Sequence, residues 1–270
     1  MTRMSSTETG APPRVLIELG TVTRLTLNRP AQANALDEAM GEELAAALKV
    51  ASREPDVRAI VLAGEGKHFS AGGDFAFIEE NTRLSREQVR ERMLRFYGLY
   101  LSVLDVPVPT IALVHGSAIG AGLCLALACD LRVGARSARL GANFLRVGLH
   151  PGMGATLLLP HVVGAAHATR LLLTARVVSG EAALALGLLG EVVDDSELRA
   201  AGERLAAQIA QGAPLAAREL VETVRAPLRS RLPAALAREA DCQASDFATE
   251  DIRTAIAAFR RGEAPVFDGR

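Results

Sequence analysis

Two glycine-rich bends, each following a short apolar run, constrain the fold of this chain most strongly. Residues 57–62 are mostly apolar and lead into the glycine-rich loop 64–74. The same order returns when the apolar run 110–114 leads into the bend 116–122. Short β-branched runs closed by glycine are typical of strands that end in tight turns. A repeated strand and glycine bend therefore predicts a chain built from successive α/β units.

Helical patterns surround these strands. Apolar residues alternate over 15–27, which predicts two half-buried strands, and an apolar side chain then recurs every fourth position from Leu36 to Leu48, as on an amphipathic helix. Ser85 and Gln88 fit a helix capping box. Beyond residue 165 nearly every pattern is helical, the exception being the short strand 191–193. We expect one domain divided into a disordered N-terminus, a core and a C-terminal helical region packed on the core, at 1–13, 14–195 and 196–270.

Composition excludes several classes of partner. The 30 Lys and Arg nearly cancel the 31 Asp and Glu, so the formal net charge of −1 gives no field that would attract nucleic acid or an anionic membrane. No signal-peptide core lies in 1–13, and no later apolar run is expected to span a bilayer. The three cysteines show no C-x-x-C spacing, which argues against disulfides or a zinc site. We expect a cytoplasmic protein without a bound metal.

Four segments, in order along the chain, resemble the enoyl-CoA hydratase/isomerase (crotonase) superfamily. They are similar to its N-R-P-x-x-x-N-A-L segment, its V-L-x-G-x-G-x-x-F-S-A-G-x-D loop, its G-x-A-x-G-G-G helix entry with the following strand, and its A-F-x-x-x-R-x-P-x-F-x-G ending. The matching residues are 27–36, 61–75, 114–122 with 129–131, and 258–269. Each segment alone is weak, but four in the right order make a specific signal.

The resemblance implies an α/β fold, a crotonase-like spiral of ββα repeats with a C-terminal helical trimerisation region. It also implies an acyl-CoA ligand and assembly as a homotrimer or a dimer of trimers. The Ala-rich helices after Ala165 carry more apolar stripes than one small core needs, which agrees with assembly. Chemistry on a thioester enolate needs no electron carrier, so no cofactor is expected beyond the coenzyme A of the ligand itself.

The two glycine bends match the family's oxyanion hole. Glycine lets a backbone N–H approach a ligand without an intervening side chain, and the first N–H groups of a helix lack internal partners. By the resemblance, the donors are the backbone N–H groups of Gly73 and Ala121, with Ala71, Gly72, Asp74 and Gly120 beside them. Ordinary tight turns are the alternative for either bend alone.

Other contacts to coenzyme A are implied less directly. Ala31, Gln32 and Ala33 lie where the family bends its backbone around the adenine, and an ordinary strand-to-helix loop is the alternative. Lys67, Arg260 and Arg261 could meet the phosphates, although a solvated basic surface explains each of them as well.

The chain departs from the family at the two hydratase glutamates. The resemblance places Cys124 and Phe144 at these positions, where hydration needs one carboxylate to activate water and another to protonate the α-carbon. A phenyl ring transfers no proton, and a thiol among leucines is expected to have a raised pKa. We therefore predict weak hydratase activity. Both residues would instead shape the acyl pocket.

Two functions stay open at the sequence level. In the first, the chain is an enzyme that stabilises a thioester enolate for isomerisation, decarboxylation or a related step. His150 is then a candidate base, although a surface histidine is the alternative, and for Glu79 and Glu80 a solvated helix face is favoured. In the second, the chain is a non-catalytic acyl-CoA carrier.

Overall fold

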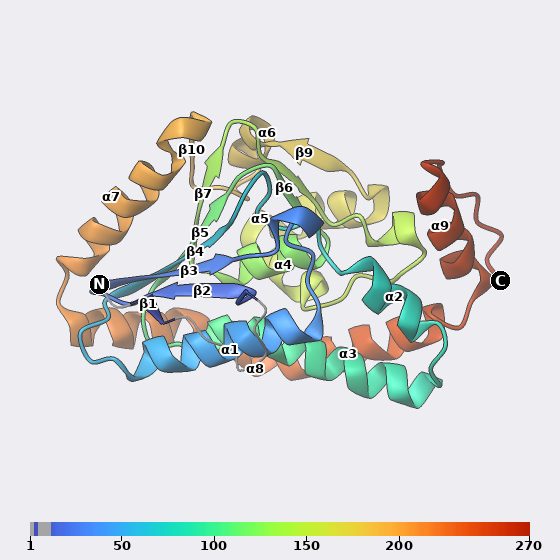
Figure 1. Ribbon diagram of the computed structural model, residues 1–270, viewed down its shortest axis with the longest axis horizontal. Coiled ribbons are helices and arrows are strands. Elements are labelled where there is room, and N and C mark those ends of the chain that lie inside the picture. The colour runs from blue at the N-terminus through green and yellow to red at the C-terminus, as the bar shows by residue number, and fades with distance from the viewer. Residues whose placement is uncertain (1–2, 5–11) are drawn as a thin grey trace.

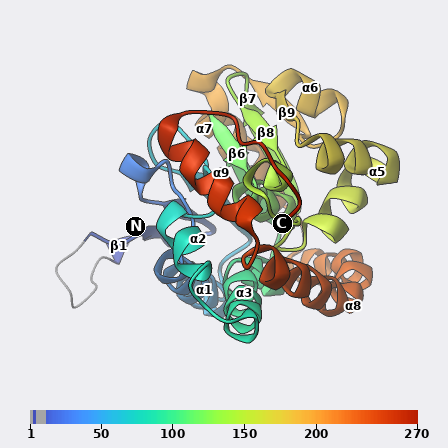
Figure 2. The same cartoon turned by 90° about the vertical axis from the view of Figure 1, so that its right-hand side faces the viewer.

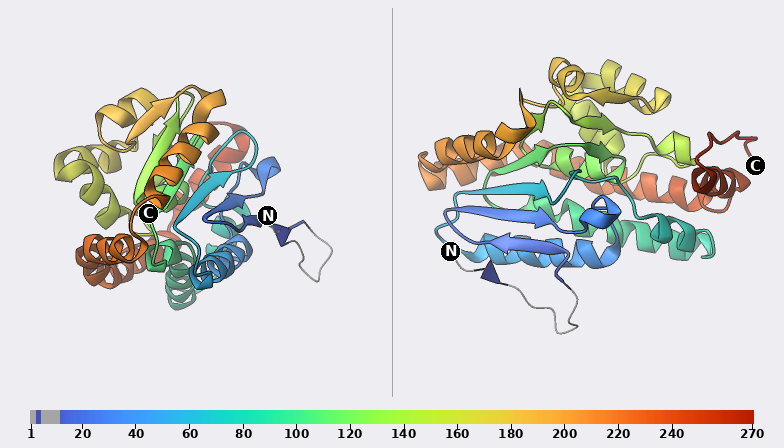
Figure 3. Two further views of the ribbon diagram at one scale, coloured as in Figure 1. Left: turned by 90° about the vertical axis from the view of Figure 1, so that its left-hand side faces the viewer. Right: turned by 45° about the horizontal axis from the view of Figure 1, so that its top comes forward.

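A computed structural model describes residues 3–4 and 12–270. Its main sheet has the strand order β1-β2-β3-β4-β5-β7-β10. Figure 3 shows strands of this sheet lying side by side. The first two pairings are antiparallel and all the others parallel. The strands are β1 (Arg3–Met4), β2 (Val15–Glu18), β3 (Val22–Leu27), β4 (Ala59–Gly64), β5 (Thr110–Val114), β7 (Leu131–Ala135) and β10 (Glu191–Val193).

Both faces of this sheet are buried, which explains the continuous apolar runs of β4 and β5. One face packs on helix α7 (Leu198–Ala210), and side chains such as Val61 and Leu113 meet Leu198 there. Alternate residues, including Ile60 and Leu62, point into the larger core on the opposite face. Figure 1 shows α7 on one side of the strands and the long helices on the other.

The long helices form the second layer. Helix α1 begins after Asp37, whose side chain accepts the N–H of Met40. Helix α3 begins after Ser85 with the predicted capping box present. They pack with α8 beneath the sheet, as Figure 1 shows. The bounds of the α-helices other than α7 are α1 (Glu38–Arg53), α2 (Phe75–Asn81), α3 (Arg86–Leu101), α4 (Ala121–Ala128), α5 (Ala155–Thr174), α6 (Gly180–Ala185), α8 (Pro214–Asp246) and α9 (Glu250–Arg261).

A second, three-stranded sheet was not expected from the sequence. It joins β6 (Ser117–Ile119), β8 (Arg139–Gly141) and β9 (Val177–Ser179) in the order β6-β8-β9. Each strand has only three residues, too few to show a period, and glycines flank β6 on both sides. The bend 116–122, expected as a loop entering a helix, therefore contains a strand that fixes its direction.

Helix α8 runs through Pro227 and Pro233 and is held to the sheet by a buried arginine. Arg225 is 3% exposed, and its guanidinium binds both carboxylate oxygens of Asp130 at 2.8 and 2.5 Å. Asp130 in turn accepts the N–H of Thr110, at the start of β5. Asp130 therefore ties the start of β5 to α8.

Helix α5 corrects the expectation that no apolar run is long enough for a membrane. By length and composition alone its 20 residues pass that test, as the core helix of a soluble protein also can. However, Gly164 has φ 75° and ψ 160°, which is not helical, so the chain is broken there. Each part is about half of the ~20 residues that a spanning helix requires.

The elements of the structure can be compared with the three segments expected from the sequence. Of the segment 1–13, residues 3–4 form β1, whereas residues 1–2 and 5–11 lie outside the described part. The segment 14–195 contains both sheets apart from β1, and 196–270 contains α7, α8 and α9. Helix α7 packs on the main sheet, α8 packs on α3 and α5, and α9 contacts the segment 144–147.

Candidate active site

A cavity of about 500 Å³ lies where α2, α3, α9 and the two glycine bends meet. Figure 2 shows α9 crossing in front of the sheets with α2 beside it. The lining is mostly apolar and aromatic, and the polar side chains in it are Gln32, Asp74, Tyr97, Asn143 and Gln243. An apolar cleft with a few polar groups is the usual form of a small-molecule site.

The first glycine bend directs one backbone N–H away from its neighbouring strand. Leu36 donates its N–H to the carbonyl of Gly72 at 2.7 Å and accepts the N–H of Asp74 at 2.8 Å. In this parallel bridge the residue between them, Gly73, has its own N–H on the opposite side. Within the described residues that N–H has no hydrogen-bond partner, and Gly73 lines the cavity.

The second bend presents an N–H at the start of a buried helix. Gly120 caps α4 with φ 54° and ψ −120°, so Ala121 is the first helical residue. The first N–H groups of a helix have no acceptor within it and lie at the positive end of the helix dipole. No partner for the Ala121 N–H occurs among the residues that the structure describes, and Ala121 also lines the cavity.

The two bends are in direct contact. The N–H of Ser70 binds the carbonyl of Ser117 at 2.8 Å, and Ile119 donates back to Ser70 at 3.1 Å. Gly72 has φ 99°, and a Cβ placed on it would lie 2.6 Å from the Ile119 carbonyl oxygen and 3.7 Å from the nitrogen of Ala121. Only glycine fits at position 72, and this close fit brings the Ala121 N–H within a few ångströms of the first bend.

The structure brings together eight of the residues expected at the site. Those that line the cavity are Gln32, Ala71, Gly72, Gly73, Asp74, Gly120, Ala121 and Phe144. Four others are outside the lining, namely Ala31, Ala33, Cys124 and His150. Ala31 lies within the short 3-10 helix η1 (Pro30–Gln32), and Ala33 is its C-cap.

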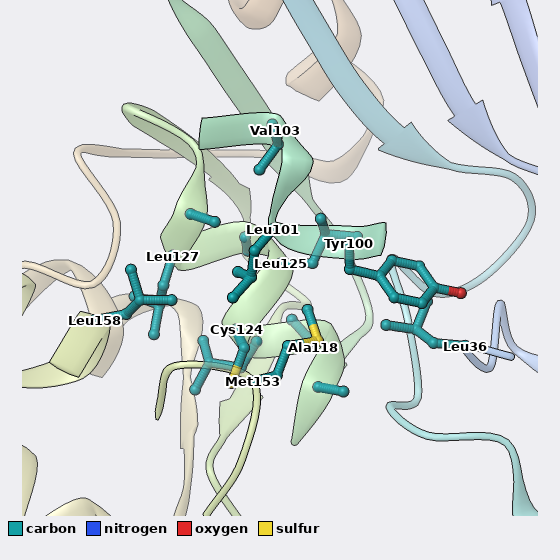
Figure 4. Packing of buried hydrophobic residues seen from close by; sticks show 14 of the residues in the cluster. Leu36, Tyr100, Leu101, Val103, Ala118, Cys124, Leu125, Leu127, Met153 and Leu158 are labelled. Atoms are coloured by element: carbon teal, nitrogen blue, oxygen red, sulfur yellow. The ribbon is translucent and has the colours of Figure 1, made fainter. Parts of the chain in front are cut away.

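Cys124 lies one layer behind the cavity wall. Its side chain is fully buried and donates to the carbonyl of Gly152 at 3.4 Å, and Figure 4 shows it among core side chains beside Met153. Burial raises the pKa of the thiol well above its usual range, and the Glu239 carboxylate adds to the rise. The expected raised pKa agrees with this, and the thiol is neither ionised nor exposed to a ligand in the cavity.

Phe144 opens the 3-10 helix η3 (Phe144–Val147) and turns its ring toward the second bend. A Cβ placed on Gly120 would lie 3.9 Å from two carbons of this ring. The ring is 8% exposed and contributes to the cavity wall. It therefore makes the space beside Ala121 apolar.

His150 is held by its surroundings away from the cavity. Its backbone N–H binds the carboxylate of Asp246 at 2.6 Å, and its ring Nδ1 is 2.6 Å from the carbonyl of Pro151. Its own carbonyl accepts from Gln243 at 2.7 Å. His150 is half-buried, contributes to the hold on the loop between η3 and α5, and is not among the described residues that line the cavity.

The charged candidates face outward. Glu79 pairs with Arg260 at 2.6 Å, and Glu80 pairs with Arg92 at 2.9 Å, as solvated helix residues do. Arg261 pairs with Glu263 at 2.6 Å, and Lys67 is exposed. Among residues 3–4 and 12–270, no three His, Cys, Asp or Glu side chains are grouped as a metal ion would require.

Asp74 is bound on two sides. Its carboxylate caps α2 by accepting the N–H of Ala76 at 2.9 Å, and it lies 3.0 Å from the Arg29 guanidinium. Asp74 therefore ties the first bend to the start of α2 and to Arg29. Its position on the lining makes it part of the wall as well.

Sequence reasoning missed the polar pair that lies deep in the cavity. Tyr97 donates its hydroxyl to Gln243 at 2.7 Å, bringing α3 and α8 together, and both residues are buried. Burial raises the pKa of Tyr97 well above its usual range, and the charge of Glu239 raises it further. Both side chains lie on helix faces that read as ordinary core, so no local motif marks them.

The outer wall was also missed. The rings of Phe75 and Phe259 stack with centroids 4.8 Å apart, next to the Glu79–Arg260 ion pair. These contacts join α2 to α9, and Ile252, Ala255 and Ile256 of α9 continue the wall. The strongly amphipathic pattern of 250–261 was the available signal, but it does not reveal which segment the apolar face covers.

Comparison with known proteins shows which family this chain is similar to. The family model for enoyl-CoA hydratase/isomerase matches residues 18–270. A putative enoyl-CoA hydratase of Thermus thermophilus is 36% identical over 253 residues, covering 94% of this chain and 100% of that protein. The mitochondrial enoyl-CoA hydratase domain-containing protein 2 of Mus musculus is 36% identical over 254 residues, covering 92% of this chain and 85% of that protein.

Solved structures agree with the sequence relatives. An enoyl-CoA hydratase of Mycobacterium avium subsp. paratuberculosis superposes with a TM-score of 0.84 at 27% identity, covering 94% of this chain and 98% of that one. An enoyl-CoA hydratase/isomerase of Pseudoalteromonas atlantica gives 0.84 at 31% identity, covering 94% and 100%. The predicted crotonase-like α/β fold is confirmed, and the chain belongs to the enoyl-CoA hydratase/isomerase family.

Proposed function

We propose that this protein binds an acyl-CoA thioester and stabilises its enolate between the backbone N–H groups of Gly73 and Ala121. The observation that carries the proposal is the contact between the two bends, where both N–H groups lack partners among the described residues and border one apolar cavity. Two fixed donors aimed at a developing oxyanion act strongly in a water-poor site, and each contributes on the order of 3 kcal/mol.

The same lining argues against efficient hydration. Among the described residues that line the cavity, the titratable side chains are Asp74 and Tyr97. Asp74 is occupied by Arg29 and the α2 N-terminus, and the pKa of Tyr97 is raised well above its usual range by burial. Neither is suited to remove a proton from water near neutral pH. With Cys124 and Phe144 at the glutamate positions, we infer that hydratase activity is weak.

The reactions that remain are those in which the enolate forms without a pair of protein carboxylates. Isomerisation of a double bond with proton transfer through the substrate, or loss of carbon dioxide from a malonyl-type thioester, fits this condition. Either step places negative charge on the thioester oxygen, where the two N–H groups would stabilise it. The apolar wall built by Phe144, Met153 and Ile256 suits an acyl chain rather than a free acid.

A carrier role is the second candidate, favoured by the lack of a base suited to neutral pH in the described lining. Binding without chemistry would use the same cavity and the same two N–H groups. The two functions differ in whether the α-carbon of a bound thioester exchanges its protons.

Proton exchange tests the proposal directly. The protein is incubated in deuterated water with hexanoyl-CoA, hex-3-enoyl-CoA and malonyl-CoA, and the products are followed by mass spectrometry and proton NMR. Deuterium at the α-carbon, a shifted double bond or acetyl-CoA supports the enzyme. Submicromolar binding of the thioesters without any of these products supports the carrier, and absence of binding contradicts both.

A further inference from the structure

Asn143 is a polar side chain in the cavity wall that no contact within the described chain explains. It immediately precedes Phe144 and caps η3, but its side chain makes no capping hydrogen bond. Its neighbours on the polar part of the lining are occupied, since Asp74 pairs with Arg29 and Tyr97 pairs with Gln243. Gln32 lies exposed at the cavity mouth, whereas Asn143 is half-buried.

The amide lies beside the second bend. A Cβ placed on Gly120 would be 3.6 Å from the amide oxygen of Asn143 and 3.9 Å from the Phe144 ring. Gly120 directly precedes Ala121, the donor proposed for the thioester oxygen. The pair Asn143–Phe144 therefore borders the part of the cavity next to Ala121, where the first carbons beyond the thioester carbonyl would lie.

An unpaired amide at this place lowers the binding affinity for a ligand whose acyl chain is purely hydrocarbon. A bound acyl chain would remove water from Asn143 without replacing its hydrogen bonds, which penalises the complex. A ligand with an oxygen near the amide would restore them. Sites that hydrogen-bond a substrate oxygen reject the analogue without it more strongly than apolar pockets reject an added group.

We propose that Asn143 is a specificity-determining residue that hydrogen-bonds an oxygen on C3 of the acyl group, so that 3-oxo- and 3-hydroxyacyl-CoA thioesters are preferred over saturated ones. The NH₂ group of the amide can donate to a 3-oxo group, and its carbonyl oxygen can accept from a 3-hydroxyl group. One asparagine side chain can therefore bind either ligand. It exchanges no proton at neutral pH, so its role is selection and positioning. This inference rests on the proposed function, because it assumes that the thioester oxygen lies at Gly73 and Ala121.

Binding measurements with matched ligands test the inference. The affinities of 3-oxohexanoyl-CoA, 3-hydroxyhexanoyl-CoA and hexanoyl-CoA are measured by calorimetry for the wild type, Asn143→Leu and Asn143→Asp. Asn143→Leu is expected to weaken both oxygenated ligands about tenfold, as loss of one hydrogen bond implies, and to leave hexanoyl-CoA unchanged or tighter. Asn143→Asp is expected to weaken the 3-oxo ligand alone, because a carboxylate accepts but does not donate.

The controls separate a binding role from a structural one and from failure of the proposed function. Gln208→Leu removes an exposed amide on α7, outside the cavity lining, and is expected to leave the affinities and the preference intact. The melting temperature of Asn143→Leu should equal that of the wild type, since no described contact is lost. Equal weakening of all three ligands, or no change in any, overturns the role of Asn143. If wild-type protein binds none of the three thioesters, the proposed function fails and this inference with it.

Discussion

The N–H of Ala121 can be removed with little disturbance because of its place in the helix. Proline is well tolerated at the first helical position, where its missing N–H has no helical acceptor to lose. We predict that Ala121→Pro folds but loses at least a hundredfold in α-proton exchange, or in thioester affinity for a carrier. Exchange is measured by mass spectrometry, and binding by calorimetry.

The control for this change is Arg86→Pro at the first position of α3. Arg86 is exposed, its N–H has no described partner, and it lies outside the cavity lining. Arg86→Pro should keep wild-type binding and exchange. Unchanged exchange and binding in a folded Ala121→Pro protein would show that Ala121 is not an oxyanion donor.

Because its thiols are buried, the protein is expected to lose stability as the pH rises into the alkaline range. Burial raises the pKa of Cys129 to about 12, with a further contribution from Asp130. Because the folded pKa is above that of the unfolded thiol, about 8.5, this stabilisation is full below pH 8.5 and is lost as pH rises toward 12. We predict that Cys129→Ala loses less stability than wild type between pH 9 and 10, by about 1.2 kcal/mol.

Urea unfolding at both pH values measures the difference. A thiol reagent gives a second readout, because Cys124 and Cys129 are buried and Cys242 is partly exposed. Only Cys242 should react in the folded protein, and all three after unfolding. Rapid reaction of Cys124 under native conditions would contradict its burial behind Gly152.

At the scale of elements, one buried carboxylate fixes the start of α5 against α8. Glu239 is fully buried and accepts the N–H groups of Gly154 and Thr156 at 2.6 and 2.8 Å, together with the Thr156 hydroxyl at 2.6 Å. Burial raises its pKa although these three bonds act in the opposite direction. The loop that it holds contains Gly152 and Met153, so this contact shapes the deep end of the cavity.

We predict that Glu239→Ala destabilises the protein by about 3 kcal/mol, because three buried donors lose their acceptor and a void remains. Thr156→Val is the matched control. It removes only the hydroxyl bond and is expected to cost about 1 kcal/mol. Urea unfolding curves measure both changes, and equal losses for the two variants would contradict the dominant role assigned to the carboxylate.

Elements with a clear period were predictable, and short or interrupted ones were not. The pattern 110–114 gave β5 with its correct bounds, and the capping box at Ser85 gave the start of α3. The three-residue strands β6, β8 and β9 carry no period, and they form only because the segments 117–119, 139–141 and 177–179 meet in space. Such tertiary pairing is absent from any local pattern.

The same division holds for the candidate site. Backbone donors in glycine-rich segments could be predicted from the family resemblance, since glycine at these places is required by close contact, as at Gly72. Side chains that reach the cavity from distant helices could not, and Tyr97 on α3 and Gln243 on α8 are examples. Their role depends on which helix faces meet, and the sequence of each helix does not state its partner.

At the scale of the whole molecule, apolar side chains remain uncovered on two helices. Leu173 at the end of α5 is 70% exposed, and Leu220 and Val224 on α8 are 61% and 56% exposed. Leu220 and Val224 lie one helical turn apart, so they share a face. Uncovered apolar faces of this kind mark protein–protein contacts in many proteins, and we propose that they contribute to a trimer or a dimer of trimers.

We predict that light scattering after gel filtration gives three or six times the chain mass of 28.4 kDa. The double variant Leu220→Glu with Val224→Glu should lower that mass, because it places four or more carboxylates in a shared apolar contact. Leu84→Glu, on the turn before α3, is the control and should leave the assembly unchanged. A monomeric wild type would contradict the proposed assembly.

The stacking of Phe75 on Phe259 has a consequence for biosynthesis. One wall of the binding chamber is supplied early in translation and the facing wall only when α9 leaves the ribosome. A nascent chain that lacks α9 therefore has an open trough in place of a chamber, because the α9 side of the wall, including Phe259, is missing. Ligand capture during synthesis must wait for that last helix.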